Sequence, residues 1–180
     1  MFYKTIKELC ELVADCPHST PQWTEKGKIV IRNNYIKNGV IDFSKPSYTN
    51  QENFEKRIKR ARPCAGDIVI TREAPIGEVG MITEDIECCL GQRQVLLRAN
   101  PKVCDKNYLL YALQSPYAKL QMSWSEGTGT TVSNLRIPFL KNINIPYIPL
   151  NKQKQISSIL KFIENKIIVN NKINDNLQDT

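Results

Sequence analysis

Residues 125–147 read Ser-Glu-Gly-Thr-Gly-Thr-Thr-Val-Ser-Asn-Leu-Arg-Ile-Pro-Phe-Leu-Lys-Asn-Ile-Asn-Ile-Pro-Tyr, and we expect the rest of the chain to be arranged around them. The first half is rich in glycine and hydroxyl side chains and has too few apolar residues to bury itself. The second half is a strand-like run of Ile, Leu and Phe between prolines. Gly127 and Gly129 permit positive φ and close approach by another backbone. The segment therefore predicts a polar loop fixed to a packed core, which either binds something outside the chain or caps its own neighbours.

The length and charge of the chain limit the class of protein. Its 180 residues are enough for about one domain with a core of its own, plus an appendage. It contains 25 Lys and Arg against 18 Asp and Glu, a net charge of +7. Such a balance favours an anionic partner, because cations that approach phosphates displace counterions. Nucleic acid fits this balance, although ribosomal and membrane-surface proteins share it.

The cysteine and histidine pattern argues against a metal site. None of the six cysteines forms a C-x-x-C pair, and His18 is the only histidine. A zinc site usually needs four such ligands in two short-spaced pairs. Charged residues interrupt the start of the chain, and no apolar run approaches membrane-spanning length. We therefore expect a cytoplasmic protein with reduced thiols, no metal and no cofactor.

Short apolar runs typical of β-strands alternate with polar connections, at residues 29–32, 40–43, 68–70, 79–82 and after Gly91. Asn38 and Gly39 form a tight-turn signal. The connections carry polar side chains suited to nucleic acid, at Arg32, Asn33, Asn34, Lys37, Thr71, Arg72, Gln92 and Arg93. Arginine can bridge a guanine bidentately and glutamine an adenine. For Arg93, a structural pair with a carboxylate is the alternative interpretation.

Three segments have the apolar spacing of helices. A short helix is expected among residues 5–13, and a longer one at 107–122 that is kinked or restarts at Pro116. Between them, Phe54 and Ile58 share a helix face. The same segment contains a dense basic cluster, namely Lys56, Arg57, Lys59, Arg60 and Arg62, with only Glu52 and Glu55 to neutralise it. This cluster either contacts phosphates or is a solvated helix face.

The composition changes after Leu150 to Asn, Lys, Gln and Ile, which predicts a domain at residues 1–150 and a helical tail at 151–180. Apolar residues in the tail recur at alternating steps of four and three, and polar residues continue the same seam toward the end of the chain. The seam comprises Ile156, Leu160, Ile163, Ile167, Asn170, Asn174 and Leu177. A lone helix with such a stripe needs a partner, so the tail is expected to be a docking helix.

Two segments suggest catalysis only superficially. Asn144-Ile-Pro-Tyr differs from the Asn-Pro-Pro-Tyr segment of adenine methyltransferases at its second residue, and no strand with a glycine-rich turn for a methyl donor accompanies it. Glu164-Asn-Lys has the spacing of a nuclease motif, but it falls in the tail helix and not on a strand beside metal-binding aspartates. We therefore expect no catalytic residues.

Four segments in fixed order resemble the specificity (S) subunit of type I restriction-modification systems. They are Gly66-Asp-Ile-Val-Ile-Thr-Arg-Glu-Ala-Pro-Ile-Gly-Glu-Val-Gly, Leu90-Gly-Gln-Arg-Gln-Val, Gly127-Thr-Gly-Thr-Thr-Val-Ser-Asn-Leu, and Ile145-Pro-Tyr-Ile-Pro-Leu-Asn-Lys-Gln-Lys-Gln-Ile with its long helix. The resemblance implies a target recognition domain of α/β (α+β) class, an irregular mixed β-sheet globule with packing helices, followed by a long coiled-coil-type helix. It also implies that the chain is not an enzyme and that methyltransferase (M) and restriction (R) subunits perform the chemistry.

A full S subunit has two recognition domains and two helices, whereas this chain holds one of each. It therefore resembles a half-subunit or an excised half of a full subunit, and we expect two copies to pair through antiparallel tail helices and read a split site in double-stranded DNA. The expected DNA contacts are the eight connection residues and five cluster residues above, together with Thr128 and Thr130. Two other classes remain open: a stand-alone methyltransferase or nuclease fragment, and an assembly module that docks through its helix.

Overall fold

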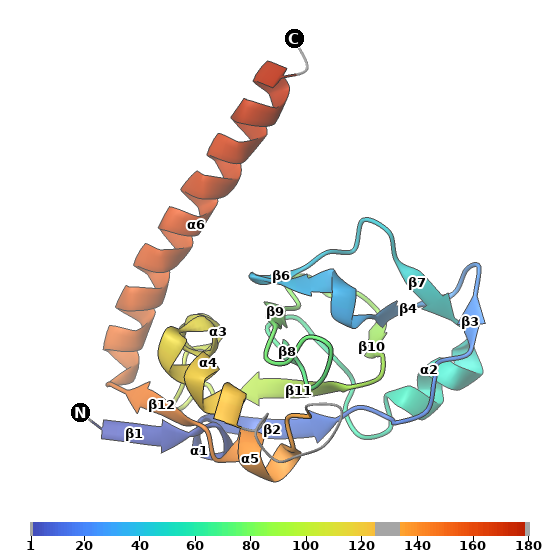
Figure 1. The fold of residues 1–180 in the computed structure, drawn as a ribbon, viewed down its shortest axis with the longest axis horizontal. Helices are drawn as coiled ribbons and strands as arrows, with labels where there is room; N and C mark the ends of the chain where they lie inside the picture. The colour runs from blue at the N-terminus through green and yellow to red at the C-terminus, as the bar shows by residue number, and fades with distance from the viewer. Residues whose placement is uncertain (1, 125–133, 179–180) are drawn as a thin grey trace.

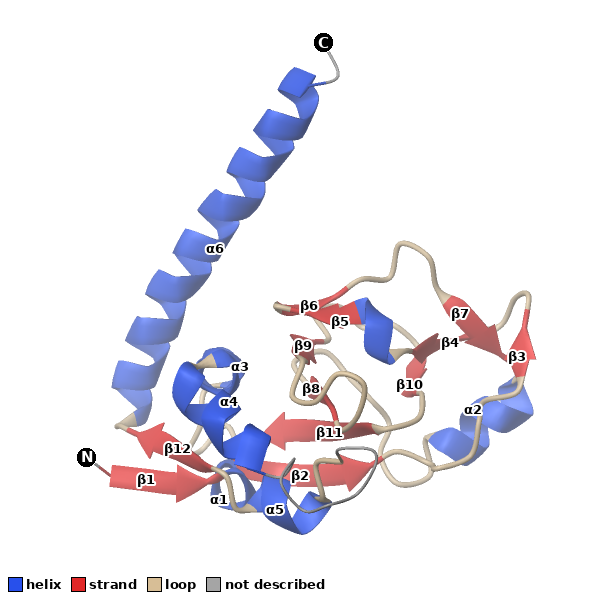
Figure 2. Ribbon diagram, viewed as in Figure 1, coloured by secondary structure: helices blue, strands red, loops and turns tan. Residues whose placement is uncertain are grey.

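The computed structural model describes residues 2–124 and 134–178, which form an α+β globule from which one long helix projects (Figure 1). Three β-sheets of six, four and two strands make up the β-structure of the described residues. Short helices cover one end of the six-stranded sheet, and the four-stranded sheet lies at the other end (Figure 2). This arrangement confirms the fold class expected from the sequence.

The six-stranded sheet forms the centre of the molecule. In spatial order it contains β2 (Cys10–Asp15), β11 (Gln94–Ala99), β8 (Ile68–Thr71), β9 (Val79–Met81), β6 (Gly39–Ile41) and β5 (Ile36–Lys37). Neighbouring strands are antiparallel except β6 and β9, which are parallel. Because successive side chains of a strand point to opposite faces, Ile68 and Ile70 pack into one apolar cluster and Val69 into another. The sheet is therefore buried on both faces.

Helices cover the first face of this sheet. They are α1 (Ile6–Leu9), α3 (Lys106–Gln114), α4 (Pro116–Ser123) and α5 (Ile137–Lys141). Leu109 and Leu113 of α3 are fully buried in the same cluster as Ile68 and Ile70. Burial of one such side chain stabilises a fold by roughly 1.5–3 kcal/mol. Beside these helices, β1 (Phe2–Thr5) pairs antiparallel with β12 (Asn144–Tyr147).

The second face packs against the four-stranded sheet, whose order is β10 (Cys88–Leu90), β4 (Lys28–Ile31), β7 (Ser47–Thr49) and β3 (Trp23–Thr24). The short helix η1 (Asn33–Tyr35) joins β4 to β5. The helix α2 (Gln51–Arg57) lies against β10, where Phe54 is buried with Val30 and Cys89. Asn50 caps α2 by accepting a hydrogen bond from the Asn53 N–H at 2.8 Å.

The last helix, α6 (Leu150–Gln178), begins on the globule and then leaves it (Figure 1). Gln153 and Ser157 are buried, whereas most later side chains that the structure describes are exposed. The tail is therefore docked through its first turns and is not a free appendage from residue 151 onward. No helix in the described part of the chain is long and apolar enough to span a membrane.

Three local expectations need correction. The segment at residues 5–13 is helical only over Ile6–Leu9, because its later residues pair with β11 as β2. The strand-like run after Arg136 begins as helix α5, since Pro138 lies in the first helical turn, where its missing N–H costs nothing. The Asn38 and Gly39 turn joins β5 to β6, with both residues at positive φ, and does not pair residues 29–32 with 40–43. The helix restart at Pro116 is confirmed.

Candidate nucleic-acid interface

A cavity of about 380 Å³ opens beside the four-stranded sheet, at the opposite end of the globule from α6. Its wall is formed by three connections: β2 to β3, β4 to η1, and β10 to β11, with Ala74 from the loop between β8 and β9. The lining residues are Pro21, Trp23, Arg32, Asn33, Asn34, Ala74, Gly91, Gln92 and Arg93. Five of the polar connection residues expected from the sequence therefore meet at one site: Arg32, Asn33, Asn34, Gln92 and Arg93.

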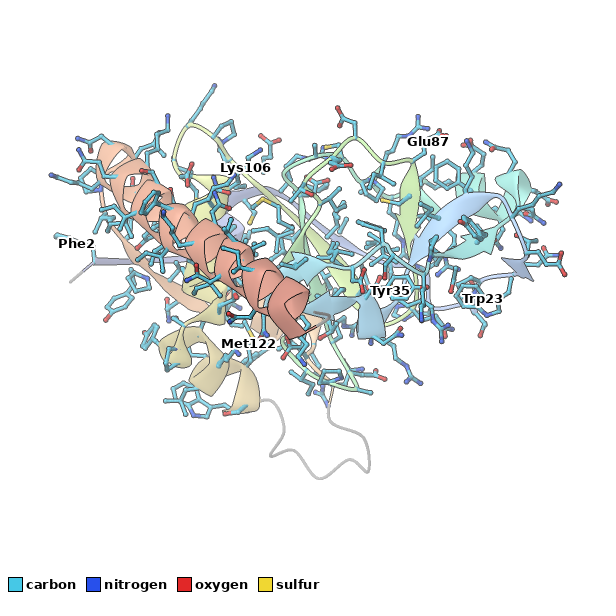
Figure 3. All side chains as sticks on the ribbon, turned by 90° about the horizontal axis from the view of Figure 1, so that it is seen from above. Phe2, Trp23, Tyr35, Glu87, Lys106 and Met122 are labelled. Atoms are coloured by element: carbon cyan, nitrogen blue, oxygen red, sulfur yellow. The ribbon has the colours of Figure 1, made fainter. Side chains whose placement is uncertain are left out.

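Arg32 and Trp23 form the outer edge of this cavity. The Arg32 guanidinium carbon lies 5.3 Å from the Trp23 ring centroid, within the range of a cation–π contact. Trp23 is 46% exposed, and Figure 3 places it at the outer rim of the molecule. This exposure favours a surface for an outside partner over a lid that closes a core.

Arg93 and Glu73 form an ion pair at the inner side of the cavity. The Arg93 Nε lies 2.9 Å from the Glu73 Oε2, and the arginine side chain remains 56% exposed. Arg93 adopts a φ of +64°, and its carbonyl accepts a hydrogen bond from the Arg72 N–H at 2.8 Å. The alternative interpretation of Arg93, a pair with a carboxylate, is thus confirmed without removing its guanidinium from the surface.

Two of the expected contacts in the loop after β8 are internal. Thr71 is fully buried, donates to the Pro75 carbonyl at 2.6 Å and accepts from the Glu78 N–H. The Arg72 guanidinium donates to the Leu135 carbonyl at 2.9 Å and to the side chains of Asp15 and Asn134 at 3.1 Å each. The expectation that Thr71 and Arg72 face DNA is therefore wrong for this structure. Both side chains shape the loop that holds Glu73.

Two amide side chains, those of Asn33 and Gln92, hold together the loops that line the cavity. Asn33 donates to the Glu73 carbonyl at 2.8 Å and accepts from the Gln94 Nε2 at 3.0 Å, so both ends of its amide are occupied. Gln92 donates from its Nε2 to the His18 carbonyl at 2.7 Å and to the Thr20 hydroxyl. Arg32, Asn34 and Arg93 are the expected reading residues of this cavity that remain exposed.

The fold buries one residue of the basic cluster and leaves the other four exposed. Arg57 is 4% exposed and donates to the carbonyls of Leu90, Gly91 and Ser19 at 2.8–3.1 Å, so the expectation that it faces phosphate is wrong. Its burial lowers the pKa of Arg57, although an arginine remains charged. Lys56, at the end of α2, and Lys59, Arg60 and Arg62, in the segment that follows it, are exposed.

The exposed cations have more partners than the local sequence indicates. Lys56 pairs with Glu52 at 2.7 Å, Arg62 with Glu87 at 2.8 Å, and Arg60 lies 3.9 Å from Asp15. Glu87 and Asp15 are distant in sequence, so a local count of carboxylates missed them. For Lys59 the described part of the chain supplies no partner. Such exposed pairs are weak, about 0–1 kcal/mol, so a phosphate can displace them.

Three other expected contacts lie elsewhere. Lys37 is exposed on β5 and does not line the cavity. Thr128 and Thr130 lie outside the described residues. Glu73 and Asn134 were not among the expected site residues, although the Glu73 Oε1 accepts from the Asn134 Nδ2 at 2.6 Å and links the loop after β8 to residue 134. The available sequence signal was that Glu73 directly follows Arg72, an expected site residue, and that Asn134 ends the hydroxyl-rich loop just before Leu135.

The tail seam is exposed as the sequence requires of a docking helix. Ile156, Leu160, Ile163 and Ile167 are 37–55% exposed, and Asn170 is exposed in line with them. The side chain of Leu177 lies outside the described set. A second apolar row, shifted by one position, was missed, comprising Ile159, Phe162, Val169 and Ile173 at 51–62% exposure. Its steps of three and four residues are interrupted by Lys166, which hid it in the sequence.

The fold and its cationic cavity define a recognition domain carried by a docking helix. Comparison with protein families agrees: the model described as "Type I restriction modification DNA specificity domain" matches residues 3–179. The chain therefore belongs to this family. Among residues 2–124 and 134–178, no three His, Cys, Asp or Glu side chains gather closely enough to hold a metal ion.

Two relatives of the chain are named as specificity subunits of type I restriction enzymes. The chain is 28% identical over 173 residues to the putative type I restriction enzyme MjaX specificity subunit of Methanocaldococcus jannaschii, covering 94% of this chain and 40% of that protein. It is 27% identical to the MjaVIII specificity subunit of the same organism, covering 96% and 41%. The chain thus spans about two fifths of the length of these relatives.

The fold is similar to that of solved specificity subunits. An HsdS subunit from Thermoanaerobacter tengcongensis superimposes with a TM-score of 0.69 at 16% identity, over 92% of this chain and 42% of that one. A type I restriction-modification S subunit from M. genitalium gives a TM-score of 0.54 at 21% identity, over 91% and 39%. At these identities the likeness concerns the fold alone.

Proposed function

We propose that this protein is the DNA-reading specificity subunit of a type I restriction-modification complex, and that it reads one half of a split site in double-stranded DNA. The observation that carries the proposal is the family match over residues 3–179, in a chain in which five of the expected reading residues line one cavity. As a protein that works on the cell's own and invading DNA, it belongs in the cytoplasm.

Two groups of residues divide the work of binding. Lys56, Lys59, Arg60 and Arg62 are exposed at the end of α2 and in the segment that follows it, where they contact phosphates and supply affinity independent of sequence. The cavity residues Arg32, Asn34, Gln92 and Arg93 reach base edges and supply discrimination. The hydrogen bond from the buried Arg57 to the Gly91 carbonyl joins α2 to the cavity wall, so the segment with the exposed cations is anchored to the cavity.

The chemistry lies in partner subunits. In this proposal the chain is not an enzyme: it directs M subunits to the base that they methylate and, through them, R subunits that cut.

The tail helix assembles the complex. The exposed seam of Ile156, Leu160, Ile163 and Ile167 pairs with the same seam of a second copy in antiparallel orientation. Two reading domains then face two halves of the target with two-fold symmetry. The second apolar row, with Ile159 and Phe162, leaves further helix surface for the M subunits.

The experiment is selection of a randomised duplex library by the full chain, alone and with its M subunit, together with a methylation map of cells with and without the protein. The proposal expects a split motif and loss of its methylation in the deletion strain. Indifference to DNA even with the M subunit present contradicts it. Methylation or cleavage by the purified chain alone, with methyl donor or magnesium, identifies it as an enzyme instead.

A further inference from the structure

We propose that the cavity contains a guanine-reading subsite in which Arg93 contacts the base and Glu73 is its positioning residue. This inference rests on the proposed function and adds to it the base and the residue that reads it. It starts from the unusual situation of Arg93, which is held by a carboxylate at one end and exposed at the other (Figure 3 shows this end of the molecule around Trp23).

The Glu73 carboxylate is fixed before any ligand arrives. Its side chain is 16% exposed, its Oε1 accepts from Asn134 at 2.6 Å, and its backbone carbonyl accepts from Asn33 at 2.8 Å. The next residue back, Arg72, is tied to Asp15 and Leu135. The Glu73 carboxylate is thus held by Asn134, on a loop whose backbone is fixed by Asn33 and Arg72, so it can fix the orientation of the arginine that pairs with it.

The pair leaves the outer edge of the guanidinium available. The contact of 2.9 Å joins Glu73 to the Arg93 Nε, the nitrogen nearest the backbone. The Nη1 and Nη2 groups have no hydrogen bond or ion pair of their own to the described residues. A guanidinium whose Nε is held presents its two Nη donors as a fork. Guanine is the base that offers two acceptors, O6 and N7, side by side in the major groove, and they match this fork.

The charge around Arg93 favours a base over a phosphate. Glu73 already neutralises this arginine, and its carboxylate repels a phosphate brought to the same guanidinium. A guanine edge is uncharged and meets no such repulsion. By contrast, Lys59 has no carboxylate partner among the described residues and suits phosphate. The same domain thus contains Arg93, which is suited to reading the DNA sequence, and Lys59, which is suited to contacting the DNA backbone.

The test compares variants of the full chain in its complex with the M subunit, by selection from a randomised duplex library and by measured Kd. The variants are Arg93→Ala, Arg93→Lys and Glu73→Gln. Lys106→Ala is the charge-matched control, because Lys106 lies near the α6 end of the molecule and Trp23 lies at the other end (Figure 3).

The wild type is expected to require a guanine at one position of the half-site. Arg93→Ala and Arg93→Lys should weaken that preference by about 5- to 100-fold, the usual value of a bidentate contact, with the other positions unchanged. Glu73→Gln should weaken it by a smaller factor, and Lys106→Ala should leave the motif unaltered.

A modified base separates reading from mere folding. Replacement of that guanine by 7-deazaguanine removes the N7 acceptor without changing its pairing. The wild type should lose affinity on this DNA, whereas Arg93→Ala should bind both duplexes equally. An unchanged motif in Arg93→Ala overturns the inference. So does a loss of affinity in Arg93→Ala that is equal for every DNA sequence and comes with a smaller salt dependence of binding, because that result marks a phosphate contact. If the wild type selects no sequence at all, the proposed function itself fails, and that result is visible before any variant is compared.

Discussion

The Gln153 Oε1 accepts a hydrogen bond from the Asp105 N–H at 2.9 Å, which fixes the start of α6 against the start of α3. The Asp105 carboxylate in turn caps α3 through the Tyr108 N–H and accepts from the Ser157 hydroxyl at 2.8 Å. The amide of Gln153 also donates to the carbonyls of Val103 and Ile148. The angle between helix and globule is therefore set by buried polar contacts, and in the proposed complex this angle sets where a partner on α6 lies relative to DNA at the cavity.

Gln153→Ala should destabilise the protein by about 2–4 kcal/mol. Gln153 is fully buried, and its removal leaves one N–H and two carbonyls without their partner. Denaturant unfolding measures the change. Lys154→Ala is the control, because that side chain is exposed on the next position of the same helix. Equal stability of the two variants contradicts the docking role of Gln153.

Arg57→Ala should cost roughly 3 kcal/mol of stability, although Arg57 belongs to the basic cluster. Its guanidinium satisfies the carbonyls of Leu90, Gly91 and Ser19, which are left unpaired when it is removed. Lys59→Ala removes the same charge from an exposed position and should change stability by less than about 0.5 kcal/mol. Thermal or denaturant unfolding of both variants distinguishes the two roles. A surface role for Arg57 requires the two values to be alike.

The double variant Lys56→Ala/Lys59→Ala should bind every DNA sequence more weakly and with a smaller salt dependence. Removing one lysine–phosphate interaction lowers the slope of log K against log salt by about 0.9, so the expected change for two lysines is about 2. Titration of one duplex at several salt concentrations measures it, with Lys106→Ala as the charge control. An unchanged slope and affinity identify the cluster as a solvated helix face.

Alkaline pH should destabilise the fold through its buried thiols. Burial raises the pKa of Cys10, Cys88 and Cys104 to about 12 from an ordinary value of 9.0. A folded-state pKa above the unfolded one gives stability that is present below about pH 9 and lost as pH rises toward 12.

Unfolding free energies at pH 8 and pH 10.5 test this sign. Cys104→Ala should reduce the loss between these two pH values by about 2 kcal/mol, because that variant has one buried thiol fewer to ionise on unfolding. Cys64→Ala is the comparison at an exposed position, where burial also raises the pKa of the thiol, and it should reduce the loss by a smaller amount. A loss that is the same in the wild type and in Cys104→Ala contradicts the assignment.

The sequence predicted the central strands because their signals are local. Ile68–Thr71 is a short β-branched run, and it is buried on both faces. The helix restart at Pro116 was equally predictable from the missing N–H of proline. Leu12, in contrast, has helical spacing with Leu9 but lies in a strand, because its pairing with Arg98 of β11 outweighs local propensity.

Which residues line the site could largely be predicted from the sequence, but which of their side chains face solvent could not. Arg32, Asn34, Gln92 and Arg93 meet as expected because short connections of neighbouring strands end at one edge. The roles of Arg57 and Arg72 depend on carbonyls and carboxylates far away in the chain, such as Leu90, Leu135 and Asp15, which no local pattern reveals. A basic residue read from sequence has a known charge, but only the fold shows whether that charge faces solvent.

Ile163→Glu should convert a dimer into a monomer. Ile163 lies in the exposed seam and is 48% exposed in the single chain, so its substitution is not expected to unfold the globule. In an antiparallel pair the seam is buried between the helices, and a carboxylate there is taken out of water without a partner. Light scattering of the full chain measures the mass. Asn165→Glu adds the same charge two positions away, outside both apolar rows, and should leave the mass at that of a dimer. Equal masses for the wild type and both variants contradict pairing through this seam, whereas a monomer only in Ile163→Glu supports it. The DNA affinity of the single domain should be unchanged in Ile163→Glu, because the cavity lies at the other end of the domain.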